Sequence, residues 1–169
     1  ETRGSFLRSR LGSLLAIAPL GVWTVAHLWN NLSAFQGEAA WQNAVTTYPH
    51  PVAQAIVLTL VLLPLLLHTA WGVGRLFTSR PNNVRYGYYA NLRYVLQRLS
   101  AVGLLLFLGA HLWLAFLEPR LLHGHPETFA DLSHEMRFHG PTLAVYVLGV
   151  LAVAYHLAHG VSGFCLGWG

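Results

Sequence analysis

The sequence lacks lysine altogether, contains one cysteine, and has few charged side chains of either sign. Charged residues are 9% of its 169 residues, whereas a soluble domain carries about 25%. The single cysteine, Cys165, excludes an internal disulfide and a cysteine-rich metal cluster. Hydrophobic residues, by contrast, make up 54% of the chain. This composition excludes an ordinary soluble domain and indicates a protein that crosses the membrane several times.

Acidic residues are scarce too. The sequence has six acidic residues and ten arginines, which give a net charge of +4. The arginines flank apolar segments instead of forming one patch, so the charge indicates no nucleic-acid partner. No small-residue cleavage site follows the first apolar run, which favours a retained helix over a signal peptide.

Four continuous apolar runs are each long enough to cross a hydrocarbon core of ~30 Å, which takes about 20 helical residues. They cover approximately residues 11–29, 51–78, 94–117 and 141–166. A membrane barrel would instead show short segments of alternating polarity. The sequence therefore predicts an all-α fold, a polytopic transmembrane bundle of four helices that forms a single domain over residues 1–169. Pro19 and Pro64 lie inside runs and predict local kinks.

Arginine is concentrated at alternate ends of these runs. Three arginines precede the first run, and five surround the connection between the second and third (Arg75, Arg80, Arg85, Arg93 and Arg98). The connection 30–50 has no arginine, and the connection 118–140 balances two arginines against four acidic residues. Because positive charge is retained on the cytoplasmic side, we expect the N-terminus and the loop 79–93 in the cytoplasm.

Four of the ten histidines lie at matched depths in the four runs: His27, His68, His111 and His156. Each is about 16–18 residues from the start of its run, or about 24–27 Å at 1.5 Å per residue. Because the runs alternate in direction, His27 and His111 are expected near the outer surface, and His68 and His156 near the cytoplasmic one. The two layers are roughly 18 Å apart in a ~30 Å core.

The sequences around these histidines sort in the same way. The outer pair shares the string AHLW at residues 26–29 and 110–113, and the inner pair shares His-x3-Gly, with Gly72 and Gly160. This is a weak internal repeat of two helical hairpins. A glycine one turn from a histidine leaves room for a flat ligand on the same helix face, although close helix packing is the common alternative. Trp29 and Trp113 lie about 200° around the helix from their histidines and are interpreted as interfacial aromatics.

Each histidine alone is explained by a hydrogen bond between helices, but two pairs at matched depth favour a cofactor. Zinc needs three or four protein ligands, and each layer offers two imidazoles without a carboxylate or thiolate. Two imidazoles suit a six-coordinate haem iron, so we predict two bis-histidine haems b. His159 competes with His156, which is preferred because it carries the glycine spacing. Arg10, Ser13 and Arg98 are candidate haem propionate contacts, although these arginines also set topology.

Four strings resemble the di-haem cytochrome b membrane anchor of the succinate:menaquinone oxidoreductase and fumarate reductase family, above all the single-chain anchor of Bacillus type. They are RLGSLLAIAPLGVWTVAHLWNN, HTAWGVGRLFT, NLRYVLQRLSAVGLLLFLGAHLW and GPTLAVYVLGVLAVAYHLAHGVSGF. The resemblance spans nearly the whole chain and includes the LQR element at residues 96–98.

The resemblance implies that His68 and His156 hold one haem near the cytoplasmic face and that His27 and His111 hold the other near the outer surface. It also implies two hydrophilic partners, an iron–sulfur protein and a flavoprotein that handles succinate and fumarate. No flavin or iron–sulfur motif is present in this chain. The chain is then expected to carry electrons between the iron–sulfur protein and a quinone, menaquinone in particular, in the bacterial cytoplasmic membrane, within a complex that can associate into a higher oligomer.

Two departures from the family pattern matter. The family usually has a fifth span, whereas this chain ends at GFCLGWG. The expected spans contain no Asp or Glu, which puts in doubt the membrane glutamates that some fumarate reductases use for protons. Candidate quinone contacts near the outer haem are Asn30, Asn31 and Trp41, although residues at helix ends often serve as caps. Two alternatives stay open: a stand-alone di-haem cytochrome b, and a histidine-based transporter or proton channel, which is disfavoured because transporter sites lie near the midplane.

Overall fold

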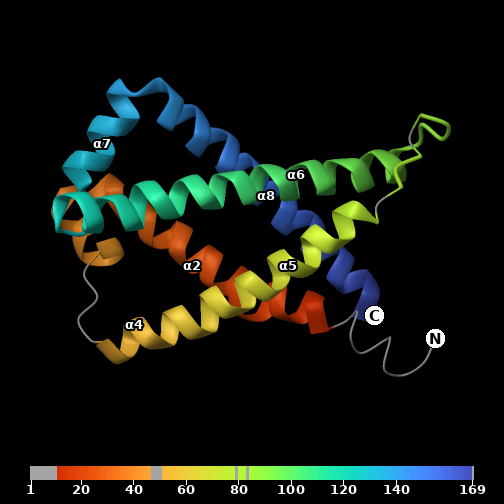
Figure 1. The fold of residues 1–169 in the computed structure, drawn as a ribbon, viewed down its shortest axis with the longest axis horizontal. Helices are drawn as coiled ribbons and strands as arrows, with labels where there is room; N and C mark the ends of the chain where they lie inside the picture. The colour runs from red at the N-terminus through yellow and green to blue at the C-terminus, as the bar shows by residue number, and fades with distance from the viewer. Residues whose placement is uncertain (1–10, 47–50, 79, 83, 169) are drawn as a thin grey trace.

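A computed structural model describes residues 11–46, 51–78, 80–82 and 84–168. Four of its helices are long and apolar enough to cross a membrane: Leu11–Gln36, Ala55–Phe77, Tyr89–His123 and Gly140–Trp168. They run up and down as one bundle (Figure 1), and the described residues contain no strand. The structure thus confirms the predicted all-α transmembrane bundle. Arg10 and His50 lie outside the described residues.

The first two helices contain wide turns beside their prolines. The π-helical segment η1 (Ala16–Gly21) contains Pro19. The π-helical segment η4 (Leu58–Leu62) follows α4 (Pro51–Val57) and leads into α5 (Leu63–Phe77), whose first turn holds Pro64. Proline has no N–H and crowds the carbonyl four residues earlier, so the backbone must widen there. The predicted distortions are therefore absorbed inside continuous helices.

The third helix is longer than the sequence predicted. After α6 (Tyr89–Leu112) it continues through η5 (Trp113–Leu117) and η6 (Pro119–His123). We expected the span to end at residue 117, but the helix continues through Pro119, which lies in the first turn of the π-helical segment η6. The extension corrects a second expectation, because the helix now carries the carboxylate of Glu118.

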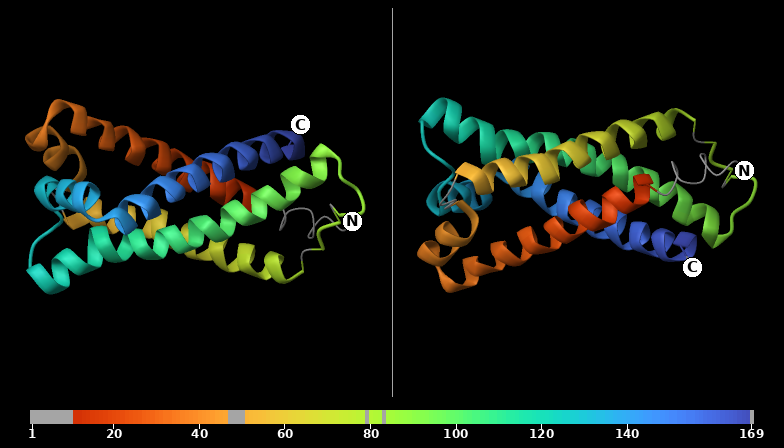
Figure 2. Two further views of the ribbon diagram at one scale, coloured as in Figure 1. Left: turned by 90° about the horizontal axis from the view of Figure 1, so that it is seen from above. Right: turned by 90° about the horizontal axis from the view of Figure 1, so that it is seen from below.

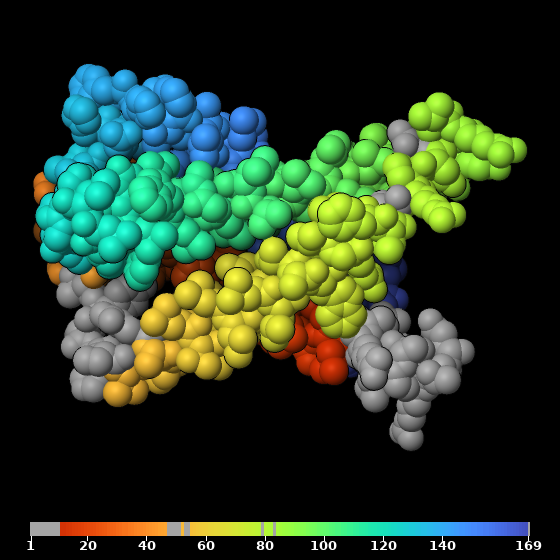
Figure 3. Space-filling model, viewed as in Figure 1, coloured from red at the N-terminus to blue at the C-terminus, as the bar shows by residue number. Residues whose placement is uncertain are grey.

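The two ends of the bundle differ. The beginning of the first described helix, the end of α8 (Gly140–Trp168) and the connection between α5 and α6 lie at one end, called here the loop end (Figures 1 and 2). That connection projects beyond the helices in Figure 3. At the other end, the cap consists of residues 32–46 and 124–139, which include α3 (Glu38–Trp41), η3 (Gln42–Thr46) and α7 (Phe129–Phe138).

The helices turn apolar side chains outward, as lipid requires. Leu106 on α6 and Leu151 on α8 are 71% and 62% exposed, and Trp41 and Val61 are the buried hydrophobic residues among those described. Such surfaces would be unfavourable in water, whereas in lipid helix association depends on close packing and hydrogen bonds. α6 and α8 form the most extensive pair. At Gly149 on α8, an added Cβ would lie 2.1 Å from the Phe107 ring on α6.

Side chains of Trp41 and Gln42 hold the cap together. Trp41 packs edge-on against Phe129 with ring centres 5.8 Å apart. Gln42 Nε2 donates to the Glu127 carbonyl at 3.2 Å, and the Phe129 N–H donates to Gln42 Oε1 at 3.1 Å. Thr128 caps the beginning of helix α7, because its hydroxyl accepts from the Asp131 N–H at 3.1 Å. The two cap segments, distant in sequence, therefore form one unit above the helix ends.

Candidate functional site

The structure brings the four histidines together in the two pairs expected from their depth. The rings of His27 and His111 have centres 6.0 Å apart at an interplanar angle of 66°; this is called the cap-side pair. The rings of His68 and His156 have centres 6.3 Å apart at 76°; this is called the loop-side pair. Each pair joins a helix from the first hairpin to one from the second.

The spacing within each pair fits two ligands on opposite sides of one metal ion. An imidazole nitrogen binds a transition metal at about 2 Å, and the ring centre lies about 1 Å behind it, so opposed rings have centres about 6 Å apart. No group of three or more His, Cys, Asp or Glu among the described residues is arranged to hold a metal. Two imidazoles are what a haem iron takes from a protein when the porphyrin fills its other four positions. Both pairs therefore fit a haem.

The second ring nitrogen is engaged in one histidine of each pair. His111 Nδ1 lies 3.2 Å from the Tyr146 hydroxyl. His156 Nδ1 lies 3.2 Å from Gln97 Nε2 and 3.4 Å from Ser100 Oγ. A hydrogen bond from the non-coordinating nitrogen orients a ligand histidine and sets its tautomer, so these contacts leave Nε2 of both rings for a metal.

The amide of Gln97 makes a second contact with His156, because its Nε2 also donates to the His156 carbonyl at 3.4 Å. Its Oε1 is buried without a hydrogen-bond partner in the described structure. The Ser100 hydroxyl, 3.4 Å from His156 Nδ1, can accept the ring N–H, which leaves Nε2 of His156 for a metal. From the sequence, Gln97 was noted only as part of the LQR string and Tyr146 was not predicted; a hydroxyl within an apolar span was the available signal.

Aromatic rings fix the planes of the cap-side histidines. Trp23 stacks on His27 with ring centres 4.7 Å apart and an interplanar angle of 9°. Phe107 stacks on His111 at 5.4 Å and 20°. Neither contact was predicted, because one turn of spacing within an apolar run resembles ordinary packing. Trp29 and Trp113 are 72% and 47% exposed, in agreement with their interpretation as surface aromatics.

Open space lies beside the two glycines of the His-x3-Gly strings. An added Cβ at Gly72 or Gly160 would meet no described atom within 4 Å. Helix packing therefore does not explain either glycine, whereas a flat ligand beside the loop-side pair would use that space. The competing His159 stacks on Tyr155 at 6.1 Å, and the described ring contact of His68 is with His156.

The described candidate propionate contacts, Arg98 and Ser13, have different hydrogen-bond partners. Arg98 donates from Nη1 to the Tyr94 carbonyl at 3.1 Å, and its guanidinium carbon lies 3.3 Å from the centre of the Tyr94 ring. Its Nε is buried without a partner among the described residues, so an anion there would satisfy it. Ser13 Oγ accepts from Trp168 Nε1 at 3.4 Å. Arg10 lies outside the described residues.

The candidate quinone contacts lie just beyond His27. Asn31 donates to the His27 carbonyl at 2.9 Å and accepts from Trp41 Nε1 at 3.2 Å. Trp41 is 3% exposed. These bonds tie the cap to the first helix and give Asn31 and Trp41 a structural role. Asn30 is exposed.

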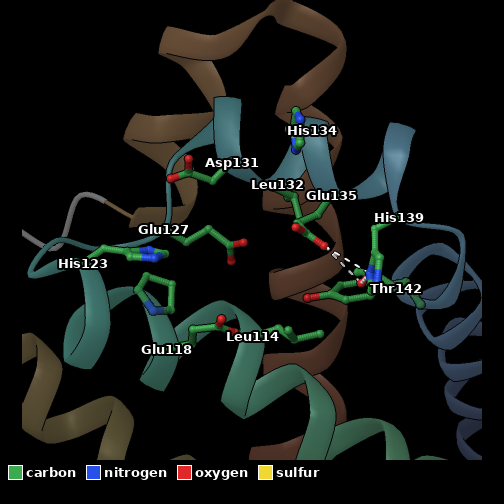
Figure 4. A pocket seen from close by; sticks show the side chains of 12 residues that line it. Leu114, Glu118, His123, Glu127, Asp131, Leu132, His134, Glu135, His139 and Thr142 are labelled. Atoms are coloured by element: carbon green, nitrogen blue, oxygen red, sulfur yellow. Dashed lines mark hydrogen bonds and ion pairs between the residues drawn. The ribbon is translucent and has the colours of Figure 1, made fainter.

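A cavity of about 350 Å³ opens in the cap beside the cap-side pair (Figure 4). Tyr146, whose hydroxyl contacts His111, is part of its wall. Carboxylates and histidines line the rest: Glu118, Glu127, Asp131, Glu135, His123, His134 and His139. Their convergence depends on how α7 folds back over the third helix.

Comparison with known proteins gives one clear relative. No protein-family profile and no solved structure matches this chain. The succinate dehydrogenase cytochrome b558 subunit of Bacillus subtilis (strain 168) is 30% identical to it over 165 residues. The alignment covers 97% of this chain and 80% of that protein.

Proposed function

This chain belongs to the family of succinate dehydrogenase cytochrome b subunits, and on that premise we propose that it passes electrons between an iron–sulfur subunit and menaquinone through two haems b. Family membership makes the chain part of a membrane-bound oxidoreductase complex. The observation that carries the finer proposal is the presence of two histidine pairs with ring centres 6.0 and 6.3 Å apart. When bound, a haem supplies an iron that takes up and releases one electron.

The residues divide this task between the two ends. His68 and His156 hold the haem nearer the iron–sulfur and flavoprotein partners, and His27 and His111 hold the haem nearer the quinone. Gln97 and Tyr146 orient one ligand in each pair through Nδ1. The ring centres of both pairs already lie at the separation that two imidazoles bound to one iron require, and such preorganisation favours binding.

Other residues near the two histidine pairs would contact the haems and the quinone. The buried Nε of Arg98 makes it the strongest candidate for a propionate at the loop end, with Ser13 and Arg10 as further contacts. Gly72 and Gly160 leave room for the macrocycle. Asn30, Asn31 and Trp41, beside His27, are the proposed quinone contacts. The arginine-rich connection between α5 and α6 faces the cytoplasm in this arrangement.

The proposal is tested by replacing ligands one pair at a time in the purified complex. We expect about two haems per chain in the native protein and about one in both His68→Ala and His27→Ala, because each variant removes one of the two imidazoles that would hold one haem. Haem extraction and reduced-minus-oxidised spectra measure the content and show which haem is gone. His159→Ala is the matched control and should keep both.

Two results would contradict the proposal. Native protein without haem would remove its basis altogether. Loss of a haem in His159→Ala but not in His156→Ala would show that the loop-side ligand was assigned to the wrong histidine.

A further inference from the structure

The cavity in the cap reaches within one residue of a proposed haem ligand. It lies between the end of the third helix, α7 and the beginning of α8 (Figure 4). Tyr146 on α8 forms part of its wall and contacts His111 Nδ1 at 3.2 Å. A group in this cavity is therefore close to the cap-side pair, at the cap end of the bundle.

One carboxylate of the cavity is buried and has no hydrogen-bond partner among the described residues. Glu127 is 9% exposed, and its side chain points into the cavity (Figure 4). Its backbone carbonyl is held by Gln42, so the residue is fixed in place, but no hydrogen bond to its carboxylate is present in the described structure. A carboxylate in that position favours its protonated form.

The neighbouring carboxylates are engaged differently. Glu135 accepts from Thr142 Oγ1 at 3.2 Å and lies 3.4 Å from His139 Nδ1. Asp131 accepts from Thr128 Oγ1 at 2.6 Å. Both are therefore held by partners, whereas Glu127 keeps its oxygens available for a ligand or a proton.

Charged and titratable groups around Glu127 come from α7, the third helix and α8. They are Asp131 and Glu135 on α7, Glu118 and Arg120 on the third helix, and Tyr146 on α8. Burial raises the pKa of Glu127 to about 7, with Asp131, Glu118 and Glu135 acting in the same direction and Arg120 against them. The wall also holds three histidines, His123, His134 and His139. Near neutral pH this carboxyl therefore changes its protonation readily.

We propose that Glu127 is the proton-exchange residue for quinone chemistry at the cap-side pair, an inference that rests on the proposed function. A quinone becomes a quinol by taking up two electrons and two protons. The electrons arrive through the cap-side pair, and Glu127 delivers the protons one at a time, regaining each from water in the cavity. In quinol oxidation the same residue accepts the protons and passes them to that water.

The test compares Glu127→Gln with the native complex, using Glu38→Gln on the exposed part of the cap as the matched control. Infrared spectra recorded across a pH titration detect the C=O stretch of a protonated carboxyl. We expect this signal to appear as the pH falls through about 7 in the native complex and in Glu38→Gln, and to be missing in Glu127→Gln. Glu127→Asp, which keeps a carboxyl, provides a second variant and should retain the signal.

Activity supplies the second readout. Positioned proton transfer contributes about 10²–10⁴-fold to a rate, so Glu127→Gln should reduce quinone reduction at least 10-fold with unchanged haem content. Its pH profile should also lose the change near pH 7. An unchanged rate and pH profile, or a retained carboxyl signal in Glu127→Gln, would overturn the inference while leaving the proposed function intact. Native protein without haem would instead overturn both.

Discussion

At the scale of single residues, hydrogen bonds to the histidine Nδ1 atoms orient the rings of the site. In His111 the Nδ1 contact goes to a tyrosine hydroxyl, and in His156 it goes to an amide and a serine hydroxyl. Such partners typically change metal affinity by 10- to 100-fold. The two pairs therefore share their ligand type but differ in the groups that orient it, so each is open to separate adjustment.

Replacement of Tyr146 tests how much its hydroxyl contributes to haem binding by the cap-side pair. Tyr146→Phe removes the hydroxyl from His111 and keeps the ring, so we expect the cap-side haem to bind at least 10-fold more weakly while the loop-side haem is unchanged. Transfer of haem to an excess of a haem-binding acceptor protein measures both losses. Tyr155→Phe, beside His159, is the control. Equal retention of the two haems in Tyr146→Phe would show that the hydroxyl does not support His111.

At the scale of helices, the position of the cap-side pair depends on how α6 and α8 meet. Phe107 on α6 stacks on His111 and also fills the space in front of Gly149 on α8. In a membrane this close approach contributes packing that the surrounding lipid does not supply. A small residue on one helix therefore helps set the plane of a histidine on the other.

A methyl group at Gly149 should disturb this contact. In Gly149→Ala the new Cβ would lie 2.1 Å from the Phe107 ring, so the ring must move and His111 loses its stacking partner. We expect lower cap-side haem occupancy and less thermal stability, measured by difference spectra during heating. Gly103→Ala is the matched control, because its Cβ would lie 3.5 Å from Ala152, an ordinary contact. Equal behaviour of the two variants would contradict this account.

The whole molecule has two distinct ends, and its arginine distribution predicts how they face the membrane. The arginine-bearing connection between α5 and α6 is at the loop end, and the acid- and histidine-lined cavity is at the cap. We expect the loop end in the cytoplasm. Electrons and protons would then enter the protein from opposite sides of the membrane when quinone is reduced.

Cysteine labelling tests this orientation. In a Cys165→Ser background, Arg85→Cys marks the loop end and Ser133→Cys marks the cap. A maleimide that cannot cross membranes should react with Ser133→Cys in spheroplasts. It should react with Arg85→Cys only in inverted membrane vesicles. Labelling of both in detergent is the control. The reverse pattern would place the N-terminus outside.

Some features of the site could be predicted from the sequence, and others could not. His27, His68, His111 and His156 were paired by counting along apolar runs, because helix rise converts sequence position into depth. The end of the third helix was missed because a charge and a proline resemble a boundary, whereas Pro119 begins a further helical turn. Tyr146 and Gln97 were missed because their roles depend on which helix lies opposite, and periodicity within one helix carries no such information.

The sequence alone determined that the chain is a four-helix membrane protein with histidines in two layers, because hydrophobic length and helix rise are local properties of the chain. The tertiary structure alone decided the ring spacings, the partners of Nδ1 and the cavity around Glu127. These depend on side chains far apart in sequence, such as Gln42 and Phe129, which meet only when the cap closes over the helix ends. Burial of a carboxylate is likewise a property of that closed arrangement, because its cost comes from the removal of surrounding water.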